Sequence, residues 1–442
     1  MSDPCRPRRG NRRRFLRQMG RAALGLGSIP FPLRSMAAGD AREMAGQANA
    51  PVAHKNLPDV VVVGAGAFGG WTAFHLVQHR ARVTLVDAWG AGHLRGTSSG
   101  ETRVIRAGYG AKTVYTAWAW RALAQWKHWE REWRTELFVP SGVLWLCAEE
   151  DAYVRSSLAA LESLKIPYER LSSEEVRRRY PQISPDGVSF GYLETQAGFL
   201  RARLATRTVA DAVARGGRVL VAAAEPPTAA TARLERLRLA DGHELAAGHF
   251  VLACGPWLPQ LFPQFLSQRI RVTKQDVFFF GPPAGDRRFE SPGLPVWIEP
   301  ASWFYGVPAT DGHGLKVAND HSGPPFDPTH GERIASPEGV ATARRYLAQR
   351  FPALATAPLV ETRVCQYEKT PDSHLVIDRH PHYENVWIVG GGSGHGFKLG
   401  PTVGELVARQ VLGLGGEAPP PEMRIGAVAY PESVDSLATS SF

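Results

Sequence analysis

Three glycines and one acid are spaced as in turns that bind dinucleotides. Gly64, Gly66 and Gly69 form a Gly-x-Gly-x-x-Gly pattern, and Asp87 follows about 20 residues later. Such glycines allow a tight turn and a close approach of the backbone to a pyrophosphate, and the acid accepts hydrogen bonds from ribose hydroxyls. The pattern predicts a site for FAD or NAD, and a purely structural glycine-rich turn is the alternative.

Two further stretches favour FAD over NAD. Residues 95–106 offer the hydroxyl side chains of Ser98, Ser99 and Thr102, followed by Arg103 and Arg106. Residues 389–401 run from an apolar segment through several glycines into a predicted helix with a proline in its first turn. A helix start of this kind can hold negative charge, which reduced flavin carries near its N1 and C2 carbonyl positions.

The elements around these stretches predict an α/β fold. An apolar strand at 60–63, a helix ending near residue 80 and a second strand at 83–86 surround the first glycines. Further strands are expected at 218–223, 249–253 and 386–389, and helices at 114–133, 149–163, 200–214, 336–350 and 402–412. Aromatic-rich alternating segments at 271–280, 294–299 and 304–308 suit an antiparallel sheet over a pocket.

This order predicts two interleaved domains, a doubly wound Rossmann-like FAD-binding domain and a substrate domain with an antiparallel sheet. The FAD-binding domain takes residues 58–110, 200–258 and 366–415, and the substrate domain takes 111–199 and 259–365. Residues 39–57 are polar and aperiodic and form a predicted linker, and residues 416–442 form a predicted C-terminal tail.

The net charge of +9 is concentrated in residues 1–38, where nine arginines and one acid, Asp3, contribute +8. This basic segment leads into a weakly apolar one and then into small residues, as in a secretion signal. Its Arg12-Arg13-Arg14-Phe15-Leu16-Arg17 run resembles the twin-arginine consensus. We therefore expect recognition by the twin-arginine export machinery and a periplasmic protein, rather than a nucleic-acid-binding arm or a basic tail. No later apolar run reaches the roughly 20 residues of a membrane span.

The chain from residue 59 to 414 resembles the monomeric sarcosine oxidase and N-methyltryptophan oxidase branch of the D-amino-acid oxidase family. The matching stretches, in the family's order, are GAGAFGG, GETRVIRAGYG, LACGPW, FYGVPA, GLK, VCQYEKTPDSHLVIDRHP and GGGSGHGFKLGP. The resemblance implies an FAD-dependent enzyme that oxidises the C–N bond of a secondary amino acid to an imine and reduces O2 to H2O2. Two alternative hypotheses remain. One is a dehydrogenase that passes electrons to a respiratory carrier, and the other is a catalytically idle, flavin-containing protein that binds amino acids.

The resemblance also implies residue roles. Cys365 falls on the cysteine that binds the flavin covalently, although free cysteines are more often buried and inert. Arg106 and Lys398 fall on positions that bind the substrate carboxylate, Lys316 on the oxygen-activating lysine, and Arg103 close to the flavin ring; in isolation such basic residues are more often solvated. Tyr305 and Tyr367 match pocket tyrosines. The candidate cofactor-binding residues are Gly64, Gly66, Phe68, Gly69, Asp87, Ser98, Ser99, Thr102, Arg103, Cys365, Gly394, His395, Gly396, Phe397 and Lys398.

One position departs from the family. Sarcosine oxidases carry an active-site histidine four residues after the lysine, where this chain has Asp320, followed by His321. A negative charge near the substrate amine argues against sarcosine itself and leaves room for a larger or more basic amino acid. The spacing does not support a metal site among His374, His380 and His382. Nor does it support the turn between a strand and a helix that carries the nucleophilic serine of many hydrolases.

Overall fold

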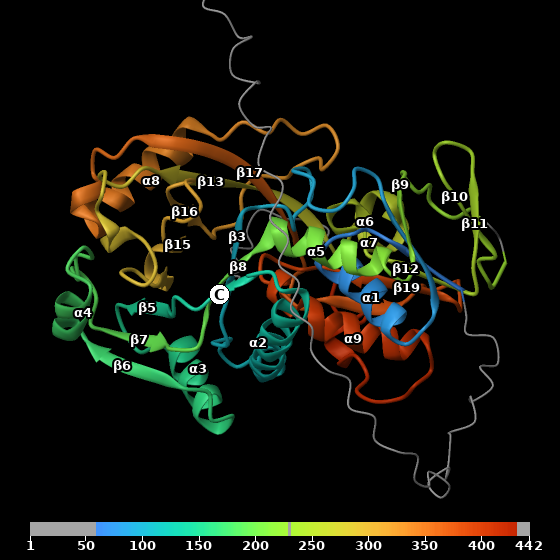
Figure 1. The fold of residues 1–442 in the computed structure, drawn as a ribbon, viewed down its shortest axis with the longest axis horizontal. Coiled ribbons are helices and arrows are strands. Elements are labelled where there is room, and N and C mark those ends of the chain that lie inside the picture. Colours follow the sequence, from blue (N-terminus) through green and yellow to red (C-terminus); the bar gives the residue numbers. More distant parts are fainter. Residues whose placement is uncertain (1–58, 229–230, 431–442) are drawn as a thin grey trace, which may run out of the picture. The chain divides into compact units, whose positions relative to one another are not determined.

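The computed structural model describes residues 59–228 and 231–430. The predicted export signal at 1–38 and linker at 39–57 lie outside the described residues. All of the described residues belong to one compact unit, and its folded elements are drawn in Figure 1. None of the helices in the described ranges is long and apolar enough to cross a membrane.

A six-stranded sheet carries the first glycine-rich turn. Its order is β18 (Val376–Arg379), β19 (Val386–Gly390), β12 (His249–Leu252), β1 (Asp59–Val63), β2 (Arg82–Asp87) and β9 (Arg218–Val221). Neighbours are parallel except β18 and β19. Val62 lies between Leu85 and Val251 in this register. The short all-apolar strands fit a parallel sheet that is covered on both faces.

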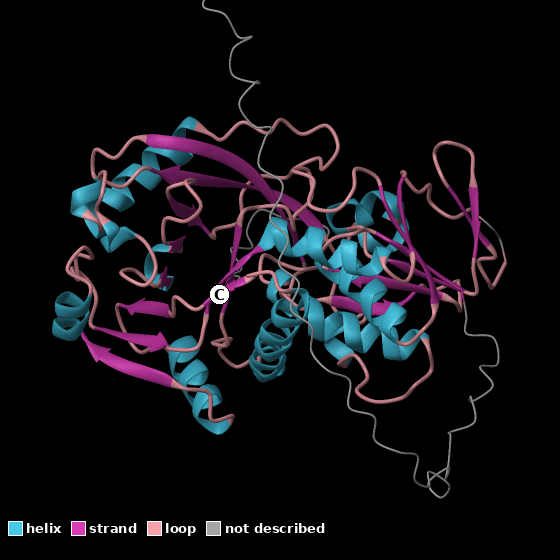
Figure 2. Ribbon diagram, viewed as in Figure 1, coloured by secondary structure: helices cyan, strands magenta, loops and turns pink. Residues whose placement is uncertain are grey.

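Helices cover one face of this sheet (Figure 2). The covering helices are α1 (Ala67–Gln78), α5 (Ala202–Ala214) and α9 (Gly400–Val411), and α2 (Thr113–Trp133) packs on α9. Helices α1 and α9 approach closely because position 404 is glycine: a Cβ there would lie 2.6 Å from Cβ of Trp71. This contact fixes the glycine-rich turn before α1 against the one before α9.

The other face of the sheet is covered by shorter elements. These are β10 (Arg236–Arg238), β11 (Glu244–Ala246), η1 (Gly255–Trp257), α6 (Leu258–Leu261) and α7 (Pro263–Leu266). Their buried residues, such as Leu237 and Leu258, join Val61 and Phe250 of the sheet in one hydrophobic cluster.

A second, eight-stranded sheet forms the other half of the unit. Its order is β17 (Leu359–Lys369), β13 (Arg271–Phe280), β16 (Leu315–Asn319), β15 (Phe304–Val307), β14 (Val296–Glu299), β5 (Val143–Cys147), β7 (Phe190–Glu194) and β6 (Tyr168–Ser172). All pairs are antiparallel except β14 with β5. Helix α8 (Pro337–Arg350) packs on this sheet. The pair β13 and β17 is long and joins the two halves (Figure 1).

A small third sheet consists of β3 (Thr102–Ile105), β8 (Gly198–Arg201) and β4 (Phe138–Val139). In the sequence, its strands lie where the chain passes from one large sheet to the other. The remaining elements are α3 (Ala152–Ser163), α4 (Ser173–Arg179), η2 (Arg287–Phe289), η3 (Pro300–Ser302), η4 (Pro352–Leu354), η5 (Phe397–Leu399) and η6 (Pro421–Met423). Strand β3 and the turn η5 matter most, because they carry Arg103 and Lys398.

The predicted fold class is confirmed. Strand β13 has the predicted bounds, and α9 begins at Gly400 with Pro401 in its first turn, as expected. Helix α3 begins three residues later than predicted because the side chain of Asp151 caps it, accepting a 2.8 Å hydrogen bond from the Val154 N–H. The domain boundaries stay a prediction, since the contacts between residues do not divide the described part of the chain.

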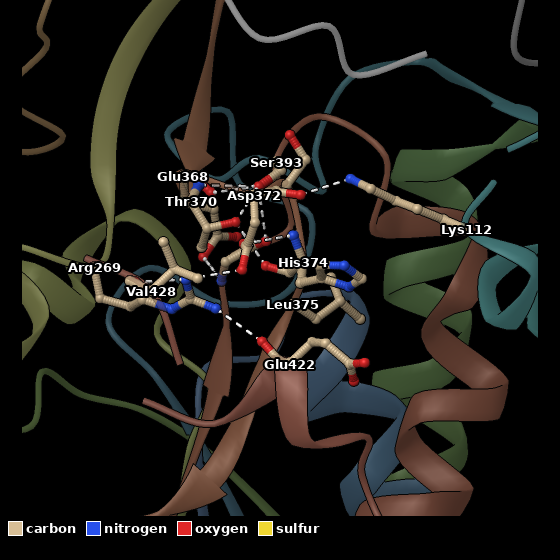
Figure 3. A network of polar contacts seen from close by, with 12 residues as sticks. Lys112, Arg269, Glu368, Thr370, Asp372, His374, Leu375, Ser393, Glu422 and Val428 are labelled. Atoms are coloured by element: carbon tan, nitrogen blue, oxygen red, sulfur yellow. Dashed lines mark hydrogen bonds and ion pairs between the residues drawn. The ribbon is translucent and has the colours of Figure 1, made fainter. Parts of the chain in front are cut away.

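The described part of the predicted tail is packed onto the body. Arg269, which is buried, donates hydrogen bonds to the backbone carbonyls of Glu422 (3.0 Å) and Val428 (2.7 Å) and forms a 3.2 Å ion pair with Asp372 (Figure 3). The backbone carbonyl of Asp372 accepts a 2.6 Å hydrogen bond from Lys112 of the loop before α2. This network ties residues 422–428 to the turn that follows β17.

Candidate active site

A cavity of about 370 Å³ lies at the carboxyl edge of the six-stranded sheet. The turns after β1, β2, β12 and β19 line it, as does β17 of the eight-stranded sheet. Predicted cofactor residues that line it are Gly64, Gly66, Phe68, Asp87, Ser98, Ser99, Arg103, Cys365, Gly394, Gly396 and Phe397. Ligands of open α/β sheets bind at this edge.

The first glycine turn has the geometry that its sequence predicts. Gly64 has φ +102°, and a Cβ there would collide with the carbonyl oxygen of Ala253. A Cβ on Gly69 would collide with the carbonyl oxygen of Gly64, so this glycine allows α1 to pack closely on the turn. Asp87 accepts a 2.8 Å hydrogen bond from the Ala65 N–H and lines the cavity.

The predicted hydroxyl residues lie in different places. The Ser98 hydroxyl accepts a 3.0 Å hydrogen bond from the Ala67 N–H at the start of α1. The Ser99 hydroxyl donates one to the Gly96 carbonyl. Thr102 does not line the cavity, and its backbone carbonyl accepts a 3.3 Å hydrogen bond from Lys316. Ser98 therefore lies where a pyrophosphate would meet the helix start.

A smaller cavity of about 50 Å³ adjoins the larger one and shares Arg103, Tyr367, Gly394 and Phe397 with it. It brings together side chains from β3, from the consecutive strands β14, β15 and β16, and from β17 and η5. The predicted site residues that line it are Arg103, Arg106, Tyr305, Lys316, Asp320, Tyr367, His395 and Lys398. Its size suits a small ligand beside a larger one.

Arg106 and Lys398 form the cationic end of the small cavity. Both are buried, and the Arg106 guanidinium lies over the rings of Tyr109 (4.6 Å) and Trp145 (5.0 Å). The Lys398 ammonium donates 2.9 Å hydrogen bonds to the Tyr109 hydroxyl and to the His395 carbonyl. Burial, with Arg106 nearby, holds the pKa of Lys398 well below its usual value. A carboxylate bound between the two would favour the protonated lysine.

Lys316 lies on β16 and lines the small cavity. It is buried and lies 5.2 Å from the centre of the Tyr305 ring. Burial, and then the nearby Arg103, lower the pKa of Lys316 to about 7, while Asp320 acts in the opposite direction. The charge of this lysine can therefore change near neutral pH.

Asp320 faces the small cavity, and His321 does not. The Tyr367 hydroxyl donates a 2.8 Å hydrogen bond to Oδ1 of Asp320, and Tyr305 is hydrogen-bonded to Tyr367. Burial raises the pKa of both tyrosines, so each keeps its hydroxyl proton. His321 is exposed and lies 5.3 Å from the Trp303 ring, outside both cavities.

Cys365 and Arg103 lie side by side in the larger cavity. The guanidinium of Arg103 is 3.5 Å from Sγ of Cys365 and also donates a hydrogen bond to the Thr97 carbonyl. Cys254 lines the same cavity, whereas the third free cysteine of the described ranges, Cys147, is buried in the core. Cys365 and Arg103 therefore both lie where a ligand of the larger cavity would contact them.

A model of the FAD dependent oxidoreductase family, abbreviated DAO, matches residues 59–410. The chain belongs to this family. Peroxisomal sarcosine oxidase of Homo sapiens is 29% identical over 371 residues, covering 80% of this chain and 92% of that protein. Monomeric sarcosine oxidase of Arthrobacter sp. is 30% identical over 359 residues, covering 79% and 91%. The predicted resemblance is confirmed.

A solved structure shows the same fold. The crystal structure of L-proline dehydrogenase from P. horikoshii superposes with a TM-score of 0.72 at 21% identity, covering 83% of this chain and 96% of that one. As a member of the FAD-dependent oxidoreductase family, the chain needs a site for FAD. The larger cavity fits one, because glycines leave the backbone open at Gly64 and Gly66, a helix start faces the cavity, and Asp87 lies beside it.

Two residues of the small cavity's surroundings were not predicted. Tyr109 accepts from Lys398 and lies 3.4 Å from Nδ1 of His395, whose Nε2 lies 2.9 Å from the Ser373 carbonyl. Burial lowers the pKa of His395 well below its usual value, so its ring is neutral. The Tyr109 hydroxyl therefore donates to His395 and orients Lys398.

Glu194 is the second missed residue. It is buried on β7 and accepts hydrogen bonds from the N–H groups of Ala107 (2.6 Å) and Gly108 (3.1 Å) and from the Trp145 indole (3.0 Å). Its charge acts on Arg106 and Lys398. No local pattern indicates this role, because 87 residues separate Glu194 from Ala107. In the described ranges, no group of three or more His, Cys, Asp or Glu is placed to hold a metal ion.

Proposed function

We propose that the protein oxidises the C–N bond of a small secondary amino acid to an imine, with O2 as the electron acceptor and H2O2 as product. The observation that carries the proposal is the small cavity, which adjoins the FAD cavity and is lined by four buried residues, Arg106, Lys316, Asp320 and Lys398. When bound, FAD supplies the hydride acceptor for this chemistry.

Arg106 and Lys398 would bind the substrate carboxylate. A guanidinium and an ammonium that converge on one wall can hold a carboxylate in a single orientation. Tyr109 fixes the position of Lys398, and Glu194 fixes the backbone beside Arg106. Such orientation of the substrate Cα–H is a large part of catalysis by proximity.

Lys316 would serve the half-reaction with oxygen. Its protonated side chain is a cation that stabilises the negative charge which O2 acquires on accepting an electron. The residue is buried, so this charge acts without screening by water. Lys316 is therefore the residue that leads us to propose an oxidase rather than a dehydrogenase.

Asp320 would shape the substrate class. It lies in the small cavity where sarcosine oxidases carry a histidine, and Tyr367 and Tyr305 connect to it by hydrogen bonds. A buried acid favours a substrate whose nitrogen carries a proton on arrival, and it disfavours a second negative charge on the substrate. We therefore propose a secondary amino acid with a neutral or cationic side chain, other than sarcosine.

The Cys365 thiol would carry the flavin through a thioether. Supporting this proposal, Cys365 lines the FAD cavity with the Arg103 guanidinium beside its Sγ.

We also propose export to the periplasm through the twin-arginine machinery, on the pattern of residues 12–17. Export is tested by fractionating cells that express the chain with Arg12, Arg13 and Arg14 intact or changed to lysine; equal amounts in the periplasm would refute it.

Peroxide formation tests the proposed reaction. Purified full-length protein is mixed with air-saturated buffer and a panel of sarcosine, N-methyltryptophan, pipecolate, proline and their basic analogues, and oxygen uptake and peroxide are followed. One peroxide for each oxygen consumed with a secondary amino acid, and not with the matching primary one, supports the proposal. Oxidation of primary amino acids alone would refute the secondary-amine class.

A further inference from the structure

Glu368 is a buried acid that lines the FAD cavity and has no part in the reaction proposed above. It follows Tyr367 on β17, and its exposed fraction is 5%. Its Oε2 accepts a 2.9 Å hydrogen bond from the Gly391 N–H, and its carboxylate also accepts from the Gly392 N–H. Figure 3 shows Glu368 beside Ser393 in the turn after β19.

This environment is costly for a carboxylate. Burial raises the pKa of Glu368 to about 7, and the two backbone N–H groups offset this only in part. An ionised carboxylate has about four acceptor sites, of which the backbone uses two here. The Glu368 side chain lines the cavity. A bound ligand with hydrogen-bond donors would therefore supply hydrogen bonds to the remaining acceptor sites.

The place of Glu368 along the cavity indicates which part of the ligand it meets. Asp87 and Glu368 are the two acids that line the cavity, and Cys254 lies within electrostatic range of both. An oxygen of Glu368 lies 3.6 Å from the Cβ position of Gly255, in the turn after β12. Glu368 thus lies between the Asp87 end and the end formed by Cys365 and Tyr367.

The chemical order of FAD runs from adenosine through pyrophosphate and ribitol to the flavin ring. Asp87 has the position of the acid that accepts from the adenosine ribose, and Tyr367 borders the small cavity where the substrate reacts. A pyrophosphate carries only acceptors and negative charge, so a carboxylate would repel it. The polyhydroxyl ribitol is the part between these ends that offers donors.

We propose that Glu368 is a cofactor-binding residue that accepts hydrogen bonds from the hydroxyl groups of the FAD ribitol. The turn at Gly391 and Gly392 presets the carboxylate for this contact, because the backbone N–H groups of both glycines donate to it before the ligand arrives. This role depends on the family's cofactor and not on the identity of the amine, so it stands or falls separately from the proposed reaction.

Release of the cofactor tests the proposal in the full-length protein. A Cys365→Ser background removes the candidate covalent bond, and FAD release after dilution is followed by flavin fluorescence with Glu368 intact, Glu368→Gln or Glu368→Asp. The flavin-free chain is then titrated with ADP, which shares the adenosine and pyrophosphate of FAD but has no ribitol. Glu130→Gln is the matched control, because Glu130 also accepts from two backbone N–H groups, at Leu137 and Phe138, and lies outside the cavity.

The proposal predicts that Glu368→Gln releases FAD roughly 10- to 100-fold faster, as expected on weakening hydrogen bonds to a charged group. ADP affinity should change less than about twofold, since ADP does not reach the ribitol position, and Glu130→Gln should match the parent. Glu368→Asp, which keeps the charge, should release FAD at an intermediate rate. Unchanged FAD release in the Gln or Asp variant, or an equal loss of FAD and ADP affinity, would overturn the proposal. Glu368 would then only stabilise the turn at Gly391 and Gly392.

Discussion

The hydroxyl of Tyr367 donates a 2.8 Å hydrogen bond to Oδ1 of Asp320. This contact holds Asp320 in a cavity whose other charged residues are arginines and lysines. It also connects Asp320 to β17, the strand that carries Cys365. Lys316 lies on β16 and Asp320 directly follows the last residue of that strand, and both side chains line the small cavity. The acid and the proposed oxygen-activating lysine therefore act on one another, as the pKa of Lys316 indicates.

The reoxidation rate should depend on the charge of Lys316. Because the pKa of Lys316 is lowered to about 7, its cation is present below that pH and is lost above it. Reoxidation of the reduced protein by O2 should therefore be fast at low pH and fall as pH rises through 7 or somewhat above, since negative charge on a reduced cofactor raises the pKa. Stopped-flow mixing with oxygenated buffer measures this rate.

Lys316→Met provides the control for that profile. It should slow reoxidation roughly 10²- to 10³-fold, the usual cost of losing one electrostatic group in a buried site. Its remaining rate should not vary with pH in this range. A Lys316→Met protein that reoxidises as fast as the parent would remove Lys316 from the oxygen reaction.

Asp320→Asn should displace the same pH profile. The Asp320 charge raises the pKa of Lys316, so its removal should move the fall in reoxidation to lower pH. Asp320→Glu should retain the parent profile. His321→Asn serves as a neighbouring control, because His321 lies outside both cavities; a shift there equal to that of Asp320→Asn would contradict the account.

Cys365 should hold the flavin after denaturation. Acid precipitation of the parent protein should leave the yellow colour in the pellet, whereas Cys365→Ser should release FAD into the supernatant. Cys254→Ser is the matched control, since Cys254 lines the same cavity and should not affect attachment. Complete release of flavin from the parent would show that Cys365 binds it without a covalent bond.

Arg269→Leu should destabilise the protein and loosen its C-terminal segment. Arg269 is buried and joins Asp372 to the backbone at Glu422 and Val428, so its loss leaves acceptors without donors and should cost about 3 kcal/mol. Urea unfolding and the rate of protease cleavage within residues 416–430 measure the two effects. Arg288→Leu breaks an exposed ion pair with Asp286 and should cost less than about 1 kcal/mol; equal effects of the two variants would contradict the assignment.

Sequence patterns predicted the parts of the site that are local. Gly64, Gly69 and Asp87 belong to one strand–turn–helix–strand unit, in which spacing alone places the side chains. The fold class followed from the alternation of strands and helices and is confirmed by the sheet order. The packing of residues 422–428 against Arg269 had no such signal, because its hydrogen bonds run to backbone carbonyls.

The meeting of distant residues was beyond local patterns. Arg106 and Lys398 reach one cavity only because α1 and α9 pack together and carry η5 towards β3, and their pairing was predicted from the family resemblance. Glu194 and Glu368 were missed because acidic residues are mostly exposed, so the sequence predicts solvated side chains at these positions. Only the fold shows that both are buried. Asp320 and His321 are adjacent just after β16, and only the folded structure shows that Asp320 lines the small cavity whereas His321 lies outside both cavities.

The most direct test of the central claim is the flavin absorbance of the full-length protein, recorded without oxygen while secondary amino acids are added and then after air is admitted. The proposed oxidase should be bleached by at least one secondary amino acid with a neutral or cationic side chain, and its absorbance should recover rapidly in air with release of H2O2. Bleaching with recovery only in the presence of an added electron carrier would contradict the oxidase, and the absence of bleaching by every amine would contradict amine oxidation while leaving FAD binding intact.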